Sequence, residues 1–247
     1  MRMLHAMSIW GKIAGAAAGL AVGGPIGALL GGFAGHYVID RDKADGEGAA
    51  GENQVAFTVG VIALGAKMAK ADGVVTADEV SAFKDVFKVP EGEMKNVARV
   101  FNLAKQDVAG YEAYAEQLAS MFKDNKELLE DILDGLFHIA GADEMMHPKE
   151  EEYLANVAAK FGFTPTEFQY IKARHVSTDR RNPYDVLGVT PEIGDDALKA
   201  QYRKLVADNH PDKHIANGMP EEFIELANEK IAAINEAYDE IAKERGI

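Results

Sequence analysis

Apolar positions recur at helical spacing along most of this chain, and the pattern is clearest near the C-terminus. In residues 195–209 the apolar side chains lie four and three positions apart, so they share one face of a helix. In residues 220–243 the same spacing produces a narrow apolar seam. Two such seams pair well, so we predict an antiparallel helical hairpin. The positions are Leu198, Tyr202 and Leu205 in the first helix and Ile224, Ala227, Ile231, Ile234, Tyr238 and Ile241 in the second.

The middle of the chain, residues 54–175, is also patterned as helices. Pairs of residues that favour turns divide it, and prolines placed just after two of the breaks suit the first turn of a helix. No segment shows the strict alternation that marks a half-buried strand, so we expect an all-α chain. The breaks fall at Asp72-Gly73, Val89-Pro90, Ala109-Gly110, Asp124-Asn125, His147-Pro148 and Thr164-Pro165.

The N-terminal pattern is different because residues 13–35 are uncharged and mostly apolar. As one helix this stretch would be roughly 34 Å long, which is enough to cross a bilayer. We therefore expect a transmembrane helix at 13–35, preceded by a short non-cytoplasmic segment, 1–12. The charged, glycine-rich and aperiodic stretch 40–53 is expected to be a linker.

Glycine recurs at every fourth position of this apolar stretch. Small residues at that spacing let two membrane helices approach closely, so the ladder predicts a homodimer formed through the span. The glycines expected at the dimer contact are Gly15, Gly19, Gly23, Gly27 and Gly31.

Three other interpretations of this stretch stay open. The first is a cleaved signal peptide, whose apolar core is usually about 7–15 residues and therefore shorter than this stretch. A flexible glycine-rich arm is a second alternative. The third is a soluble hairpin that breaks at Gly24-Pro25 and packs on protein. Length and lack of charge favour the membrane span.

Composition narrows the function classes. The formal net charge of −14 argues against a general nucleic-acid binder, and the absence of cysteine excludes disulfides. The hydrophobic share of 47% is enough for two folded units. Common phosphate-loop, nucleophile-elbow and helical zinc motifs are missing, so an enzyme finds little support. No cofactor or metal is expected.

The tripeptide His210-Pro211-Asp212 lies between the two helices of the predicted hairpin. Pro211 has no backbone N–H and disfavours helix at the preceding residue, so it ends the first helix and stiffens the loop. Asp212 presents a carboxylate there, and Lys213 a nearby cation. On the helix before the loop, the face opposite the apolar one is basic and carries Lys199, Arg203 and Lys204.

This arrangement resembles the J domain. Residues 182–189 resemble its first helix, 202–205 its second-helix signature, and 234–238 its third helix. The resemblance implies that the basic face and the loop dock on a DnaK-type chaperone and stimulate its ATP hydrolysis. Asp208 departs from the family pattern, which often has lysine there. The residues implied in docking are Lys199, Tyr202, Arg203, Lys204, His210, Pro211, Asp212 and Lys213.

The middle region contains a near-repeat: residues 70–79 are echoed by 141–150. Both copies resemble the TerB-like helical fold. Their acids offer the oxygen ligands that Ca²⁺ prefers. An acid at the start of a helix more commonly caps it, so we favour capping over metal binding. The acids concerned are Asp72, Glu79, Asp143 and Glu150.

Taken together, the span, a TerB-like domain at 54–175, a linker at 176–181 and a J domain at 182–247 resemble the DjlA family of membrane-anchored bacterial J proteins. That resemblance implies an inner-membrane co-chaperone whose C-terminal bulk is cytoplasmic, where DnaK-type chaperones and ATP are found. The alternative is a membrane adaptor or stress sensor whose TerB-like domain binds a cation or a protein and whose J-like domain is inactive. The intact His-Pro-Asp triad favours the co-chaperone.

Overall fold

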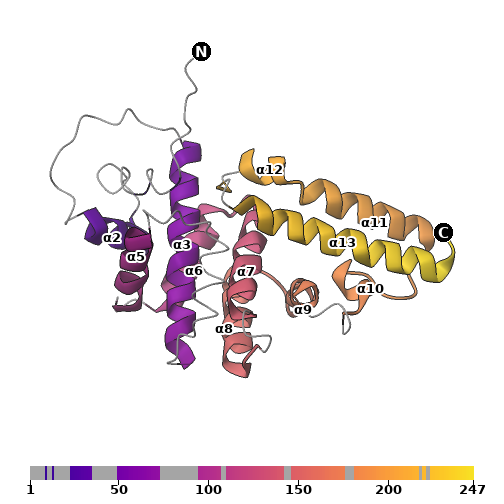
Figure 1. The fold of residues 1–247 in the computed structure, drawn as a ribbon, viewed down its shortest axis with the longest axis horizontal. Helices are drawn as coiled ribbons and strands as arrows, with labels where there is room; N and C mark the ends of the chain where they lie inside the picture. The colour runs from indigo at the N-terminus through magenta and orange to yellow at the C-terminus, as the bar shows by residue number, and fades with distance from the viewer. Residues whose placement is uncertain are drawn as a thin grey trace, which may run out of the picture.

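The computed structural model describes residues 9, 13, 23–34, 49–72, 94–106, 110–141, 146–175, 181–216, 219–220 and 223–247. Within these residues the chain is helical and contains no strand, as the sequence predicts. Figure 1 shows a bundle of upright helices from which a pair of long C-terminal helices extends sideways.

Eleven helices are described, and they fall into two groups. The bundle consists of α2 (Gly24–Ala34), α3 (Ala49–Asp72), α5 (Met94–Gln106), α6 (Tyr111–Met121), α7 (Lys126–Ala140), α8 (Pro148–Lys160) and α9 (Pro165–Arg174). The C-terminal group consists of α10 (Pro183–Val186), α11 (Asp195–Asp208), α12 (Pro211–Ala216) and α13 (Ile224–Arg245).

Several of the predicted breaks are confirmed by the capping groups that form them. The Asn125 side chain accepts a hydrogen bond from the backbone N–H of Leu128 at 3.2 Å, at the start of α7. Thr164 and Glu167 form a reciprocal capping box at the start of α9. The breaks near residues 73 and 89 lie outside the described residues.

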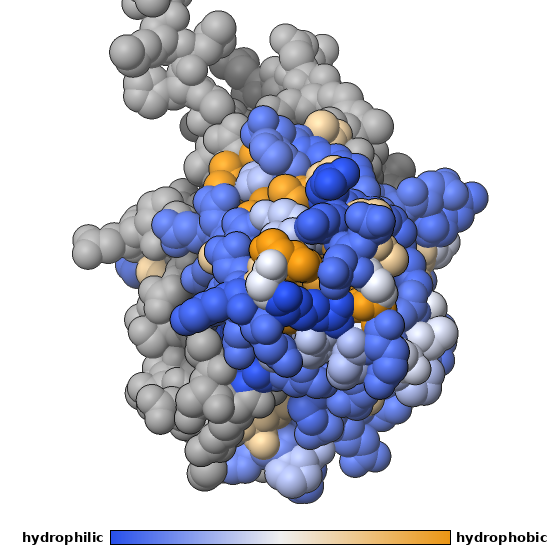
Figure 2. All heavy atoms as spheres, turned by 90° about the vertical axis from the view of Figure 1, so that its right-hand side faces the viewer, coloured by the Kyte–Doolittle hydropathy of each residue, from blue (hydrophilic) through white to orange (hydrophobic). Residues whose placement is uncertain are grey.

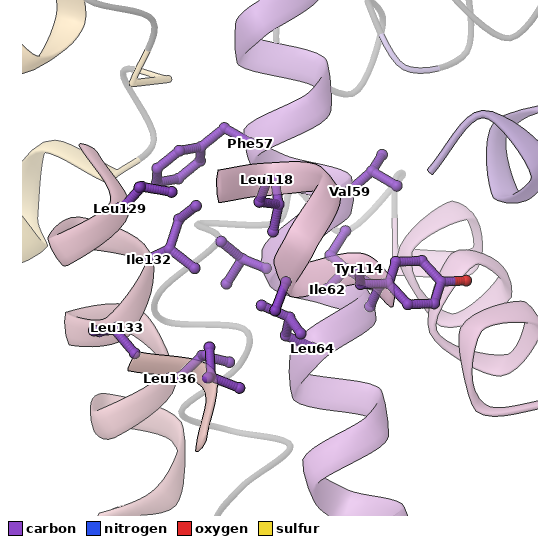
Figure 3. Packing of buried hydrophobic residues seen from close by; sticks show 14 of the residues in the cluster. Phe57, Val59, Ile62, Leu64, Tyr114, Leu118, Leu129, Ile132, Leu133 and Leu136 are labelled. Atoms are coloured by element: carbon purple, nitrogen blue, oxygen red, sulfur yellow. The ribbon is translucent and has the colours of Figure 1, made fainter. Parts of the chain in front are cut away.

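Helix α3 is the centre of the bundle. Its side chains from Val55 to Met68 are almost all buried, so it is apolar on every side rather than along one stripe. Figure 3 shows Phe57, Ile62 and Leu64 packed between residues of α6 and α7. Helix α3 begins at Ala49, so residues 49–53 of the stretch expected to be a linker belong to its first turns.

Gly60 sets how closely α6 approaches α3. A Cβ atom added at this glycine would lie 2.6 Å from Cδ2 of Leu118 on α6. The two helices therefore pack at a distance that only glycine allows at this position.

Helix α2 packs on the outside of the bundle through its apolar residues Ile26, Leu29 and Leu30. The side chain of Gln117 on α6 accepts a hydrogen bond from the N–H of Ile26 at 3.0 Å and donates one to the carbonyl of Gly23 at 2.6 Å. Gly24 has a φ of +69°, so the chain turns sharply before Pro25. Within the part of the chain that the structure describes, no helix is long and apolar enough to cross a membrane.

The predicted hairpin is confirmed: α11 and α13 run antiparallel, and α10 packs near the end of the pair that carries the C-terminus (Figure 1). Its core is separate from that of the bundle and is built from all three helices. The buried residues are Tyr184, Val186, Leu187, Leu198, Ile234, Ala237 and Ile241.

Helix α13 belongs to two cores. Its C-terminal part fills the hairpin core, whereas Leu226, Ala227 and the preceding Phe223 are buried with the apolar residues of the bundle. The Phe223 ring meets the Phe57 ring of α3 edge to face, with ring centres 4.9 Å apart. The hairpin is therefore packed against the bundle, an arrangement that the sequence pattern did not predict.

Candidate functional site

The His-Pro-Asp loop lies at the tip of the hairpin, where the chain passes from α11 into the first turn of α12. Helix α11 ends at Asp208, and the Asn209 side chain donates a hydrogen bond to the carbonyl of Leu205 at 2.8 Å. The His210 carbonyl accepts from the N–H of Lys213 at 2.9 Å, so α12 begins at Pro211. The prediction that the first helix ends before Pro211 is confirmed, but Pro211 and Asp212 lie in the first turn of α12, a short helix that the sequence pattern did not predict.

The side chains of the loop are open to solvent. The Asp212 side chain is 89% exposed and that of His210 is 57% exposed. The Asp212 N–H donates to His210 Nδ1 at 3.3 Å, and the Asp212 carboxylate lies 3.9 Å from the same nitrogen. Both side chains are available to a partner.

The basic face of α11 is present next to the loop. Arg203 and Lys204 are exposed, and Lys199 is half-buried. The Lys213 ammonium is 3.0 Å from the Asp208 carboxylate, and this hydrogen bond raises the pKa of Lys213. Asp208 therefore pairs with Lys213, and the exposed charge of the face comes from Arg203 and Lys204.

Tyr202 lies inside the hairpin rather than free on its surface. Its ring stacks on that of Tyr238 with centres 4.1 Å apart, and its hydroxyl donates to Asn235 Oδ1 at 2.9 Å. The side chain is half-buried. A contact between Tyr202 and a partner stays a prediction, and the structure adds a role in joining α11 to α13.

A buried group of charges joins the hairpin to the bundle just behind the loop. Lys230 of α13 is 3% exposed, and its ammonium lies 2.7 Å from Glu130, 3.3 Å from Asp131 and 3.1 Å from Asp134, all on α7. Arg174 at the end of α9 also contacts Glu130, at 2.7 Å. We call these five residues the charge cluster.

The pKa shifts of Lys230 and Asp134 indicate that the neighbouring opposite charges keep both groups ionised. Burial disfavours the charged form of Lys230, but the carboxylates of Asp134 and Glu130 outweigh it and raise the lysine pKa. Burial likewise works against the Asp134 carboxylate, and Lys230 and Arg174 more than compensate, so the pKa of Asp134 is lowered. The cluster is a set of compensated buried charges.

His214 of α12 links the charge cluster to the loop. The imidazole is 2% exposed; its Nδ1 is hydrogen-bonded to Asp131, and its Nε2 lies 3.0 Å from the Asp208 carbonyl. Burial disfavours protonation, but the hydrogen bond and charge of Asp131 outweigh it and raise the pKa of His214.

Sequence reasoning missed His214 and the charge cluster. A signal was present: Lys230 lies three positions after Ala227 and four before Ile234, so it is on the apolar seam of its helix. A lysine is rarely buried without a partner, so its position called for acids on a neighbouring element. Asp131 and Asp134, three positions apart, share one face of α7 and supply them.

The acids considered as metal ligands behave as caps where the structure describes them. Glu150 is buried, and its carboxylate accepts a hydrogen bond from the N–H of His147 at 2.9 Å, which caps α8. The Asp72 side chain, Glu79 and Asp143 lie outside the described residues. Among the residues that are described, no group of three or more His, Cys, Asp or Glu side chains is arranged to hold a metal ion.

The glycine ladder is only partly described. Gly23 and Gly31 are exposed, with no atom within 4 Å of a Cβ added at either. Gly27 is half-buried on α2. Gly15 and Gly19 lie outside the described residues.

The end of the hairpin that carries the C-terminus has a mostly hydrophilic surface. Figure 2 looks at the end of the molecule that carries the C-terminus and shows a mostly hydrophilic surface with small apolar patches between charged side chains. Ile247 is the large apolar residue that is exposed among those described, at 41%.

Three family models match the chain, one after another. Residues 7–54 match the model described as Co-chaperone DjlA transmembrane domain, 58–173 match Tellurite resistance protein TerB, and 182–245 match the DnaJ domain. The first covers α2 and the start of α3, the second most of the bundle, and the third the hairpin.

Several relatives match this chain over nearly the whole length of both proteins. A Vibrio vulnificus protein described as Co-chaperone protein DjlA is 33% identical over 97% of this chain and 99% of its own length. Proteins with the same description from Photobacterium profundum and Escherichia coli K12 are 30% and 27% identical, over 96% and 97% of this chain and 99% of their own lengths. No solved structure matches.

Proposed function

Because this chain belongs to the DjlA family of membrane-anchored J-domain co-chaperones, we propose that it recruits a DnaK-type chaperone to the bacterial inner membrane and stimulates its ATP hydrolysis. One observation carries the proposal. The His-Pro-Asp loop lies exposed at the hairpin tip, on the same helix pair as the exposed cations of α11, while the start of α13 is packed on the bundle.

In this proposal the two parts of the site have different roles. Arg203 and Lys204 attract an acidic surface of the chaperone and orient it on α11, because exposed charges steer association. The Asp212 carboxylate then engages an arginine of the chaperone through charge-assisted hydrogen bonds. His210 and Pro211 limit the conformations of the loop, so less entropy is lost when Asp212 binds.

The chain itself is a regulator and needs no cofactor for this task. The DnaK-type partner binds and hydrolyses ATP, and the J domain supplies the contact that triggers the step. The C-terminal bulk is therefore placed in the cytoplasm, with a single N-terminal span and residues 1–12 on the other side of the membrane.

The test is single-turnover ATP hydrolysis by a DnaK-type chaperone, with the full chain in lipid nanodiscs. We expect His210→Gln and Asp212→Asn each to abolish stimulation. Loop residues this exposed contribute little to packing. We therefore expect the helical content to stay the same and the free energy of unfolding to change by no more than about 0.5 kcal/mol. Asp196→Asn, an exposed acid at the other end of α11, is the matched control and should keep full stimulation. Full stimulation by the Asp212 variant would refute the mechanism.

We also propose that the span forms a homodimer through the glycine ladder. Two J domains on one membrane patch would raise the local density of recruited chaperone. Replacing Gly19, Gly23 and Gly27 with Leu should separate the dimer in a membrane cross-linking assay and leave the protein in the membrane. Ala17→Leu with Ala21→Leu, on the opposite side of the ladder, should leave the dimer intact. Equal cross-linking of the two variants would exclude the ladder as the contact.

A further inference from the structure

The helix that carries the end of the His-Pro-Asp loop is anchored on the other domain. Helix α12 has six residues, and a helix of this length is not stable alone in water. Its buried anchor is His214, two positions after Asp212, which contacts Asp131 in the bundle. The conformation of the loop is therefore tied to a contact between the TerB domain, which is the bundle, and the J domain.

Both partners of the His214 ring are hydrogen-bond acceptors. Nδ1 meets the Asp131 carboxylate and Nε2 meets the carbonyl of Asp208, two positions before His210. A neutral imidazole carries one N–H and can satisfy one of them, whereas the charged ring donates to both. The geometry thus selects the protonated form of His214.

The charges around the ring favour the same form. Asp131 faces His214 from α7, and the Lys230 ammonium faces it from α13. Behind them, Glu130 and Asp134 of α7 add two negative charges and Arg174 of α9 adds a positive one, and the His175 ring that follows α9 is hydrogen-bonded to Asp134 at 2.7 Å. The three carboxylates outnumber the two fixed cations, so the surrounding charge favours a protonated His214.

We propose that His214 is a positioning residue for the His-Pro-Asp loop and that Asp131 of the TerB domain holds it in place, so that the TerB domain fixes the geometry in which the J domain meets its chaperone. This inference rests on the function proposed above. The packed arrangement is the competent one, because it leaves Asp212 and Arg203 exposed while α12 is held from behind. We call the contact between His214 and Asp131 the clasp.

The clasp makes loop positioning depend on pH. Since Asp131 raises the pKa of His214, the contact is fully formed below the ordinary histidine pKa of about 6.5 and weakens as the pH rises through the raised value. The concentration of co-chaperone that gives half-maximal stimulation should therefore rise as the pH rises.

The first experiment measures the clasp without the chaperone. Hydrogen exchange of the full chain reports the backbone N–H groups of Lys213 and His214, which are bonded to the His210 carbonyl. Asp131→Ala should expose both to exchange. Glu229→Gln is the control, because Glu229 pairs with His138 at 3.6 Å, also between α13 and the bundle, but does not touch α12. Unchanged protection in Asp131→Ala would overturn the clasp.

The second experiment measures what the clasp does for the chaperone. In Asp131→Ala the concentration of co-chaperone that gives half-maximal stimulation should rise roughly tenfold, the order expected when a short loop must be ordered on binding. Maximal stimulation should be kept, and Glu229→Gln should match the wild type. Exposed α12 amides together with an unchanged half-maximal concentration would show that the contact is packing alone and overturn the positioning role.

A conservative variant covers the case in which Asp131→Ala fails to fold. His214→Gln keeps an uncharged N–H donor toward Asp131 but has no group that titrates. The half-maximal concentration should then be independent of pH, whereas that of the wild type rises as the pH passes through the raised pKa of His214. A wild-type profile as flat as that of the variant would overturn the inference. If the wild type gives no stimulation, the proposed function fails and the positioning role with it, while hydrogen exchange still reports the clasp.

Discussion

Replacing Lys230 with Met is the sharpest test of the charge cluster. Met fills a similar volume but leaves the carboxylates of α7 without their central cation. Glu130 keeps Arg174 and is 22% exposed, so water can reach it, and Asp131 keeps His214. The Asp134 carboxylate loses the most stabilisation, because its side chain is 3% exposed and its remaining close partner is His175 at 2.7 Å. Removing one partner of a buried ion pair costs about 3–5 kcal/mol, and with one strongly affected carboxylate we expect the lower end, about 3 kcal/mol.

Urea unfolding followed by circular dichroism measures this loss. Lys243→Met, an exposed lysine on the same helix, is the matched control and should change stability by no more than about 0.5 kcal/mol. Adding Asp134→Asn to Lys230→Met should restore roughly 1–2 kcal/mol, because it removes the charge left without a partner.

The pH dependence gives a second check on the same variant. In the wild type, Lys230 and Arg174 hold the pKa of Asp134 low, so this carboxylate stays ionised in the folded protein. Without Lys230 its pKa rises, and the folded state takes up a proton as the pH falls. Relative to the wild type, the variant should therefore regain stability on acidification. A loss below about 1 kcal/mol at neutral pH, with no regain in acid, would refute the view that these charges are buried together.

Three further changes probe other parts of the molecule. Arg203→Ala with Lys204→Ala should weaken chaperone docking and reduce its salt dependence in a binding titration; salt-independent docking of the wild type would place the contact elsewhere. Phe223→Ala should cost about 3–5 kcal/mol in urea unfolding, and a cost below about 1 kcal/mol would contradict its burial against Phe57. Gly188→Ala should lower the free energy of unfolding by roughly 1–3 kcal/mol, because Gly188 has a φ of +64° and an added Cβ would lie 3.2 Å from the Tyr170 ring. An unchanged midpoint of urea unfolding would exclude strain at this position.

The family, the order of its domains and the helical hairpin were predictable because their signals are local. The spacing of Leu198, Tyr202 and Leu205 defines one apolar face, and the proline of the His-Pro-Asp loop marks where the helix ends. The same holds for the capping groups Asn125 and Thr164, which act within three residues of their own position. Each of these features depends on neighbours that can be seen together in the sequence.

The packing of the hairpin on the bundle was not predictable in the same way. His214 and Asp131 are 83 positions apart, and Lys230 and Asp131 are 99 apart, so no local pattern connects them. The sequence showed a lysine on an apolar seam and two acids on a helix face, each of which alone is common. Tyr202 illustrates the same limit, because helical spacing put it on the apolar face but did not show that its hydroxyl binds Asn235.

Because of helix α13, the J domain of this chain cannot simply be excised or exchanged for that of another protein. The domain boundary in the sequence lies near residue 182, yet Met219, Phe223 and Leu226 complete the interior of the other domain. Excising the J domain would turn these side chains into an apolar patch and would release Lys230 into solvent without its acids. Grafting a foreign J domain onto the TerB domain would leave a matching hole and would remove Lys230 and His214, the partners of Asp131. Exchange between relatives should therefore succeed only when α7 and α13 are transferred together.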